Sequence, residues 1–205
     1  MILYPNAKIN IGLNVVNRRE DGYHNISSIF YPTTSLFDIL EVIHSDFFSF
    51  TSTGITIPEG ENICCRAFSL LKKDFDISNV KIHLHKQIPV GAGVGGGSSD
   101  GAFTLIALNK LFNLELSNEQ LKRYALSLGA DCPFFIDNKT SYVGGLGEKI
   151  TTINLNLSEY HLKFNFSNIH ISTKQAYSAI IPVLPKKNIL ELINHPLEDW
   201  KGNII

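Results

Sequence analysis

IPVGAGVGGGSSDGA, residues 88–102, is the stretch that decides the fold of this 205-residue chain. It places five glycines within residues 91–97, and two serines follow them. In residues 80–88, which lead into the glycines, apolar and polar side chains alternate as they do in a half-buried strand. In residues 102–112, apolar side chains recur at helical spacing. The sequence therefore predicts a strand, a glycine-rich loop and a helix, in that order.

This loop has the chemistry of an anion-binding site. Glycines let the backbone approach a ligand and turn its N–H groups inward, and a helix N-terminus carries about half a positive charge. Serine hydroxyls can contact phosphate oxygens or a bound Mg²⁺, which prefers hard oxygen ligands. A flexible linker is the alternative, but linkers rarely join a clear strand to a clear helix. We predict that phosphates are bound by Gly91, Gly93, Gly95, Gly96, Gly97, Ser98 and Ser99.

Two other phosphate-binding motifs compete for this stretch. A Walker loop ends in Gly-Lys-Ser/Thr, and no lysine lies between Gly91 and Lys110, so that motif is absent. Gly91, Gly93 and Gly96 do satisfy G-x-G-x-x-G, the spacing of dinucleotide-binding folds. That fold also expects an acidic residue at the end of the next strand, whereas Glu115 lies in a polar stretch before a helix cap. The dinucleotide reading remains a weaker alternative.

The rest of the chain mixes strands and helices. Residues 8–15 alternate like a strand, and the following Asp21-Gly22 pair indicates a hairpin. A capping box begins a helix at Ser117, and Gly129 closes it. We expect residues 130–136 to form a short loop. Strand-like patterns return in residues 151–157 and 161–166. The predicted fold class is therefore α+β.

Glycines near residue 147 mark a predicted domain boundary. We expect an N-terminal domain over residues 1–147 and a second over residues 148–205. The second contains few predicted elements and several prolines, too few for an independent core. We therefore expect its C-terminal part to be absent from this chain.

Composition excludes several classes of function. Lysine and arginine number 18 against 19 aspartate and glutamate, so no net basic field favours nucleic acid as a partner. No apolar run approaches the ~20 residues that cross a bilayer, so no membrane partner is expected. Two of the three cysteines, Cys64 and Cys65, are adjacent, which disfavours a disulfide framework and favours the cytoplasm. The histidines complete no metal-binding spacing, so no metal ligands are predicted among the side chains. The oligomeric state leaves no pattern in the sequence.

Two charged residues are candidates for catalysis of phosphoryl transfer, which needs charge neutralisation and often a carboxylate at the acceptor hydroxyl. Asp131 lies in LGADCPFF, just past a predicted helix end, where loops commonly carry function. Lys8 lies on the first predicted strand. From these patterns alone, a turn aspartate and a solvated strand lysine remain open alternatives.

Five segments in order resemble the GHMP kinase superfamily. They are PNAKINIGL at 5–13, RREDGYH at 18–24, IPVGAGVGGGSSDGA at 88–102, LGADCPFF at 128–135 and GLGEKI at 145–150. Together they extend over some three quarters of the chain. The second and fourth segments are most similar to the branch that phosphorylates a cytidine-diphosphate-linked methylerythritol, in the non-mevalonate route to isoprenoids.

The resemblance implies an enzyme, an ATP-dependent small-molecule kinase acting with Mg²⁺. Asp131 is then expected to be the general base at the 2-hydroxyl of the substrate, and Lys8 orients it and offsets charge. Asn62 is expected near adenine, and Lys86 near the nucleotide. The resemblance also implies the GHMP-kinase two-domain fold, an N-terminal mixed α/β domain with an incomplete ferredoxin-like second domain.

The same resemblance assigns the small-molecule substrate, a cytidine diphosphate. Tyr23 is expected to stack on cytosine and His24 to form hydrogen bonds with it, because the base has an aromatic face and polar edges. Asn10, one strand period from Lys8, is expected to help hold the substrate. The segment ISTKQAY at 171–177 adds two further contacts to the base, from Thr173 and Tyr177.

Two departures leave other functions open. Gly101 stands where alanine is usual in the family, which predicts a helix start weaker by up to ~1 kcal/mol. The superfamily's third motif, a glycine-rich loop in the second domain, is missing, so we expect low turnover. The alternatives are another GHMP small-molecule kinase, acting on homoserine or a mevalonate derivative, and a nucleotide-binding fragment without turnover.

Overall fold

The structure of the chain is a computed structural model that describes residues 1–58, 60, 62–166, 180, 182 and 187–200. The chain divides into two compact units. The first contains Met1–Lys8 and Pro32–Asn138, and the second contains Ile9–Tyr31 and Lys139–Ile205. These units alternate along the sequence, whereas the predicted domains follow one another, so the division at residue 147 stays a prediction.

A mixed four-stranded sheet forms the base of the first unit, in the order β1-β4-β6-β5. Its strands are β1 (Ile2–Leu3), β4 (Ile39–His44), β5 (Ser49–Gly54) and β6 (Val80–Lys86). β5 runs parallel to β6, and the other neighbours are antiparallel. Along β6, buried and more exposed side chains alternate, which confirms the strand predicted before the glycines.

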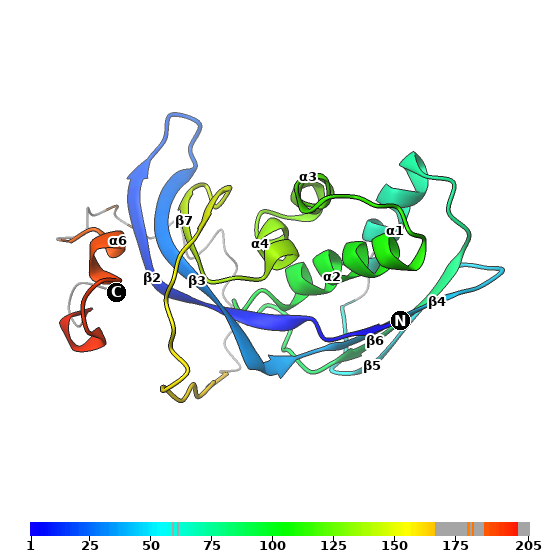
Figure 1. Cartoon of the computed structure of the whole chain (residues 1–205), viewed down its shortest axis with the longest axis horizontal. Helices are drawn as coiled ribbons and strands as arrows, with labels where there is room; N and C mark the ends of the chain where they lie inside the picture. The colour runs from blue at the N-terminus through cyan, green and yellow to red at the C-terminus, as the bar shows by residue number, and fades with distance from the viewer. Residues whose placement is uncertain (59, 61, 167–179, 181, 183–186, 201–205) are drawn as a thin grey trace. The chain divides into compact units, whose positions relative to one another are not determined.

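Four helices lie over one face of this sheet (Figure 1). They are α1 (Ile63–Asp74), α2 (Gly96–Leu111), α3 (Asn118–Leu128) and α4 (Cys132–Asp137). The predicted helix after the glycines is α2, and its Leu105 and Leu108 are fully buried. The capping box of α3 is present, with Ser117 and Gln120 bonded reciprocally and Gly129 at the C-cap. Both helix predictions are confirmed.

The loop predicted for residues 130–136 is wrong, because most of it is helix α4. Pro133 lies at the first helical turn, where its fixed φ angle suits a helix and its missing N–H costs nothing. Phe134 and Phe135 are buried, so packing stabilises a helix that is too short for its pattern to reveal.

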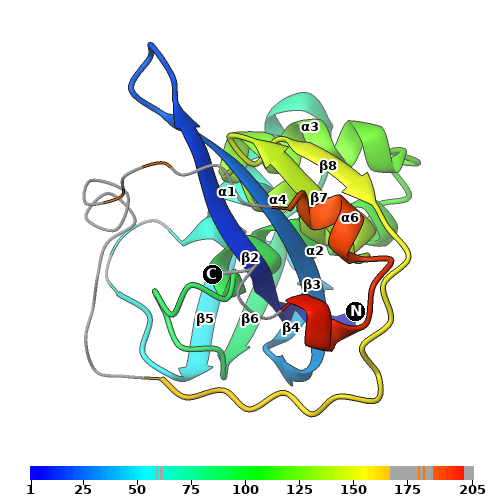
Figure 2. The same ribbon diagram turned by 90° about the vertical axis from the view of Figure 1, so that its left-hand side faces the viewer.

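The second unit is built on the sheet β2-β3-β7-β8, which is drawn with α6 in Figure 2. Its elements are β2 (Asn6–Arg18), β3 (His24–Phe37), β7 (Ser141–Gly145), β8 (Lys149–Thr152), α6 (Ile189–Leu192) and the 3₁₀ helix η1 (Leu197–Trp200). β2 and β3 form the predicted hairpin, and each strand has residues in both units. A cluster of Ile29, Ile189, Leu192 and Trp200 is the core of the second unit.

Of two strand predictions in the second unit, one is wrong in extent and the other is wrong. β8 ends at Thr152, so most of the strand expected over 151–157 is absent, although Ile153 and Leu155 pack on the core cluster. Residues 161–166 form no strand, and most of their side chains are exposed. Alternation shows which side chains can share a face, but a strand also needs a neighbouring edge to pair with. The fold class, α+β, is confirmed.

Candidate active site

The glycine-rich loop joins β6 to α2, and glycine is required at several of its positions. Gly91, Gly93 and Gly95 have φ angles of 75°, 74° and 74°, a region that L-residues with side chains rarely adopt. A Cβ on Gly95 would lie 2.9 Å from Cζ of Phe135, which is closer than real contacts allow. These three residues with left-handed backbone conformation turn the chain tightly just before α2 begins.

The N-terminus of α2 presents backbone donors on this loop. Gly95 is the N-cap residue and provides no side chain to satisfy them. In an α-helix the first N–H groups have no intrahelical acceptor, which leaves those of Gly96, Gly97 and Ser98 for a ligand. The helix dipole adds partial positive charge at the same point. This geometry suits an anion such as a phosphate.

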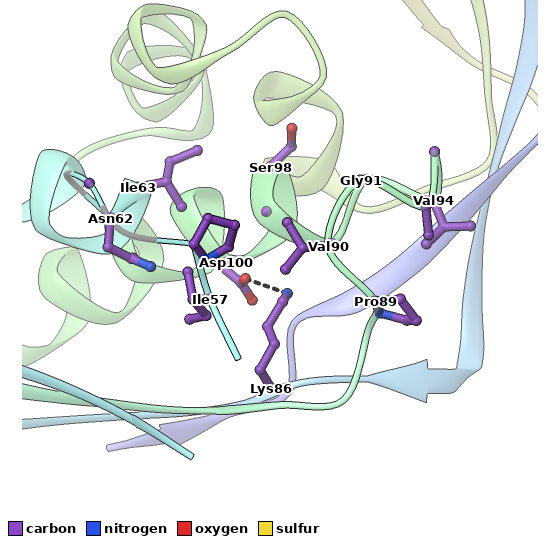
Figure 3. Close-up of a pocket in the computed structure, with 17 residues that line it drawn as sticks. Ile57, Asn62, Ile63, Lys86, Pro89, Val90, Gly91, Val94, Ser98 and Asp100 are labelled. Carbon is purple, nitrogen blue, oxygen red and sulfur yellow. Dashed lines mark hydrogen bonds and ion pairs between the residues drawn. The ribbon is translucent and has the colours of Figure 1, made fainter. Parts of the chain in front are cut away.

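A pocket of about 370 Å³ opens over the loop, as Figure 3 shows. Seven of the predicted phosphate and nucleotide residues line it together with Lys86: Asn62, Gly91, Gly93, Gly95, Gly96, Gly97 and Ser98. Ile57, Ile63 and Val90 supply apolar walls. Ser99 does not line this pocket. Its hydroxyl is buried and has no hydrogen-bond partner among the described residues.

Asn62 projects toward the pocket from the start of α1 (Figure 3). It is the N-cap residue of that helix, and its Oδ1 accepts a hydrogen bond from the N–H of Cys64 at 2.8 Å. The capping bond uses the oxygen of the side-chain amide. Asn62 therefore has a structural task besides its predicted place near adenine, which stays a prediction.

Lys8 and Asp131 form an ion pair beside the loop. The Lys8 Nζ lies 3.2 Å from Asp131 Oδ2, and the Lys8 N–H donates to the carbonyl of Val94 at 2.9 Å. The Lys8 side chain is 2% exposed, whereas that of Asp131 is 36% exposed. Asp131 is the N-cap residue of α4 but makes no capping bond with its side chain. Its carboxylate is therefore open to solvent on one side and held by the lysine on the other.

Burial shifts the pKa of Lys8. It lowers the pKa of the ammonium group, and the attraction and hydrogen bond of Asp131 offset only part of this effect. The structure thus brings together the two residues predicted to be catalytic, which are 123 positions apart in the sequence. Their catalytic roles stay a prediction.

Lys86 was predicted to lie near the nucleotide, and the structure shows two further contacts of its side chain. It lines the pocket, but its ammonium group donates to Asp38 Oδ2 at 2.5 Å and to Asp100 Oδ2 at 2.7 Å. Sequence reasoning missed both aspartates. Asp100 is visible as the acidic residue directly after the two serines, but nothing near Asp38 in the sequence links it to the loop.

The predicted substrate residues do not belong to the first unit. Asn10, Tyr23 and His24 are in the second unit, where Asn10 is exposed and Tyr23 is 65% exposed. Tyr23 donates its N–H to Asp21 Oδ1 at 3.1 Å within the hairpin turn. Thr173 and Tyr177 lie outside the described residues. The substrate contacts of all five stay predictions.

Comparisons with known proteins identify the family. The profile of the GHMP kinases N terminal domain matches residues 62–139. The chain is 45% identical to the 4-diphosphocytidyl-2-C-methyl-D-erythritol kinase of Azobacteroides pseudotrichonymphae, over 100% of this chain and 78% of the relative. It is 42% identical to the kinase of the same name from Parabacteroides distasonis, over 100% of this chain and 76% of that one.

Solved structures agree with the sequence comparison. A crystal structure of 4-(cytidine 5'-diphospho)-2C-methyl-D-erythritol kinase is 36% identical, with a TM-score of 0.76, and the match covers 95% of this chain and 71% of that one. Homoserine kinase from Cytophaga hutchinsonii matches with a TM-score of 0.59 at 16% identity, over 91% of this chain and 62% of that one, which shows a shared fold alone. The chain therefore belongs to the GHMP kinase family and, within it, to the 4-diphosphocytidyl-2-C-methyl-D-erythritol kinases.

Proposed function

We propose that the chain transfers the terminal phosphoryl group of ATP to the 2-hydroxyl of 4-diphosphocytidyl-2-C-methyl-D-erythritol. GHMP kinases use ATP, and the relatives at 39–45% identity over the whole chain carry the name of this enzyme. The observation that carries the proposal is the Lys8–Asp131 pair beside the phosphate loop. It provides an accessible carboxylate next to a helix N-terminus suited to phosphates.

In this reaction the hydroxyl oxygen forms a bond to the γ-phosphorus, and the bond from that phosphorus to the bridging oxygen of ADP breaks. Asp131 accepts the proton of the hydroxyl, because it is half-exposed and makes no capping bond. Lys8 holds that carboxylate in place and offsets negative charge as it develops. The N–H groups at the start of α2 hold the phosphates. The products are ADP and the 2-phosphate of the substrate.

Magnesium fits the hydroxyl groups at the start of α2. Ser98 lines the pocket at the start of the helix, and Mg²⁺ prefers hard oxygen ligands such as its hydroxyl. When bound, the ion neutralises charge on the ATP phosphates. Ser98, which lines the pocket, is the residue that we expect to face it.

We also propose a cytoplasmic location. All three cysteines lie in the described part of the chain, and they form no disulfide there, which suits a reducing compartment. In the same part of the chain, no helix has the length and apolar character required to cross a membrane.

The product identifies the reaction. Purified chain is incubated with ATP, Mg²⁺ and the cytidyl substrate, and the mixture is analysed by mass spectrometry and phosphorus NMR. We expect a phosphorylated cytidyl product, with the new phosphate on the carbon that carries the 2-hydroxyl. A substrate analogue without that hydroxyl should give no product. Phosphorylation of homoserine or mevalonate in preference to the cytidyl substrate would contradict the proposal.

A nucleotide-binding chain without turnover is the second candidate. Titration calorimetry with a non-hydrolysable ATP analogue separates it from the first, because binding is measured apart from transfer. ATP binding with no product under any condition would favour the second candidate.

A further inference from the structure

A buried charge cluster lies directly behind the phosphate loop. It consists of Asp38, Lys86 and Asp100, whose side chains are 0–3% exposed. Charged groups are rarely buried to this degree unless they are paired, since removing them from water is costly. The cluster touches the pocket through Lys86 and Asp100, which both line it (Figure 3).

Asp38 holds the segment that leads into the loop. Its Oδ1 accepts hydrogen bonds from the backbone N–H groups of Gln87, at 2.6 Å, and Ile88, at 2.9 Å. Its Oδ2 accepts the ammonium hydrogen of Lys86. Three donors converge on one carboxylate, and hydrogen bonds of this charge-assisted kind are among the strong ones in proteins. Asp38 therefore fixes the chain where it leaves β6.

Lys86 links the segment before the loop to the helix after it. It bonds to Asp100 in the second turn of α2, so the residues just before and just after the glycines are fastened to one ammonium group. A Cβ added to Gly96 would lie 2.7 Å from Cγ2 of Ile88 and 3.2 Å from Nζ of Lys86, so both side chains pack closely behind this glycine. The loop is therefore anchored at both of its ends.

Asp100 differs from Asp38 in its hydrogen bonds. Its Oδ2 accepts from Lys86, but its Oδ1 is buried with no partner among the described residues. Burial raises the pKa of Asp100 well above its usual value, Lys86 counteracts this, and the nearby Asp38 carboxylate raises it further. With Asp100 protonated, Lys86 and Asp38 cancel and the cluster is neutral. With Asp100 ionised, one net negative charge would lie behind a phosphate site.

We propose that Asp38 and Asp100 are positioning residues for ATP: Asp38 anchors the loop as an anion, and Asp100 acts as a neutral acid that keeps negative charge away from the phosphates. This inference rests on the proposed function, because it assumes that the loop binds ATP. The two aspartates share one lysine, yet replacement by asparagine should affect them in opposite ways.

The first test compares Asp38→Asn with wild type in steady-state kinetics. Loss of a hydrogen bond between charged groups should raise the KM for ATP by about tenfold or more, with a much smaller change in the KM for the cytidyl substrate. Asp137→Asn is the matched control, since it removes a carboxylate that pairs with Lys122 in the same unit but away from the pocket. If both KM values rise equally, the anchoring role of Asp38 is wrong.

The second test measures the affinity for an ATP analogue from pH 6 to pH 9 by calorimetry. The groups that face Asp100 are Asp38 beyond β3, Lys86 on β6 and Cys64 on α1, and the pKa values of Lys86 and Cys64 are raised. Wild type should lose affinity as rising pH ionises Asp100. Asp100→Asn cannot ionise, so it should lose this pH dependence and bind more tightly than wild type at the alkaline end.

The outcomes separate the inference from the proposed function. If wild type fails to bind the analogue, the proposed function fails before the cluster is tested. If wild type binds and Asp100→Asn weakens binding at every pH, Asp100 acts as an anion and the inference is overturned. Should Asp38→Asn not fold, Asp38→Glu keeps the charge but displaces the carboxylate. It should weaken ATP binding selectively, and normal ATP binding would overturn the anchoring role.

Discussion

Lys8 is a charged side chain in an almost dry position. It is 2% exposed, its carboxylate partner is half-exposed, and burial keeps its pKa below the ordinary lysine value. A depressed pKa means that this ammonium loses its proton at a lower pH than an exposed lysine does. Its positive charge is available below the lowered pKa and disappears as the pH rises through it. Any step that depends on that charge should weaken in the same range.

The alkaline limb of the pH–rate profile should therefore report Lys8. In wild type, kcat/KM for the cytidyl substrate should fall at a pH below the usual lysine range. Lys8→Arg reduces the rate because its geometry differs, but it should move the limb to higher pH, since arginine stays protonated. Lys122→Arg is the control, because the pKa of Lys122 is raised and it pairs away from the loop. If the alkaline limb stays at the same pH in Lys8→Arg, a group other than Lys8 is responsible for it.

Two substitutions separate the helix-capping role of Asn62 from its predicted role in ATP binding. Asn62→Asp keeps a capping oxygen and adds negative charge at the start of α1, so stability should be unchanged or slightly higher. It loses the amide donor, so we expect weaker ATP binding. Asn62→Ala should lose both the capping oxygen and the amide donor, and the loss of the cap should lower the free energy of unfolding by about 1 kcal/mol. Urea denaturation and calorimetry measure the two effects. Normal ATP affinity in both variants would remove Asn62 from the nucleotide site.

The element that defines the site is the loop together with α2. Two of its glycines, two positions apart, have opposite environments. Gly95 has a left-handed backbone and a blocked Cβ position, whereas a Cβ on Gly97 would meet nothing within 4 Å. A methyl group added at these two positions should therefore have opposite effects on stability.

Gly95→Ala should lower the free energy of unfolding by about 1–2 kcal/mol for the left-handed backbone alone, and overlap with Phe135 adds to this. Gly97→Ala should leave stability equal or raise it by up to about 1 kcal/mol, because alanine favours helix. Urea unfolding of both variants beside wild type measures the difference. Equal stability of the two variants would mean that the loop does not adopt this conformation in solution.

Local pattern accounts for the elements that could be predicted. Strand alternation, the glycines and the capping box at Ser117 each act over a few residues, and each is found where the sequence indicated. Helix α4 was not predicted, because packing stabilises its six residues and so short a segment shows no helical pattern. Gly101 shows the same limit: an alanine there would favour helix, but its Cβ would lie 2.9 Å from Ile63 on α1. The close packing of two helices explains the glycine.

At the scale of the whole chain, contacts distant in sequence were the hardest to predict. The bond between Asp38 and Lys86 joins residues 48 positions apart, and no motif in either segment signals it. Lys8 and Asp131 were candidates from the residue patterns, but those patterns also allowed a turn aspartate and a solvated lysine. Only the resemblance to a family assigned them catalytic roles. The fold class followed from local patterns, whereas the charge cluster required the structure.

The second unit should contribute to recognition of the cytidyl substrate. Tyr23→Ala removes an exposed ring and should raise the KM for that substrate while the KM for ATP stays nearly constant. Tyr23→Phe keeps the ring and should behave almost as wild type. Steady-state kinetics with each substrate varied in turn measures both effects. An unchanged KM in Tyr23→Ala would remove the stacking role assigned to this residue.

The most direct test of the central claim is the turnover of Asp131→Asn, with affinity for an ATP analogue measured on the same sample. The substitution keeps the size of the side chain and removes its ability to accept the proton. We predict that kcat falls by about 10²–10⁴-fold while the affinity for the analogue stays close to that of wild type. Turnover near the wild-type rate in Asp131→Asn would contradict the assignment of the Lys8–Asp131 pair as the catalytic centre.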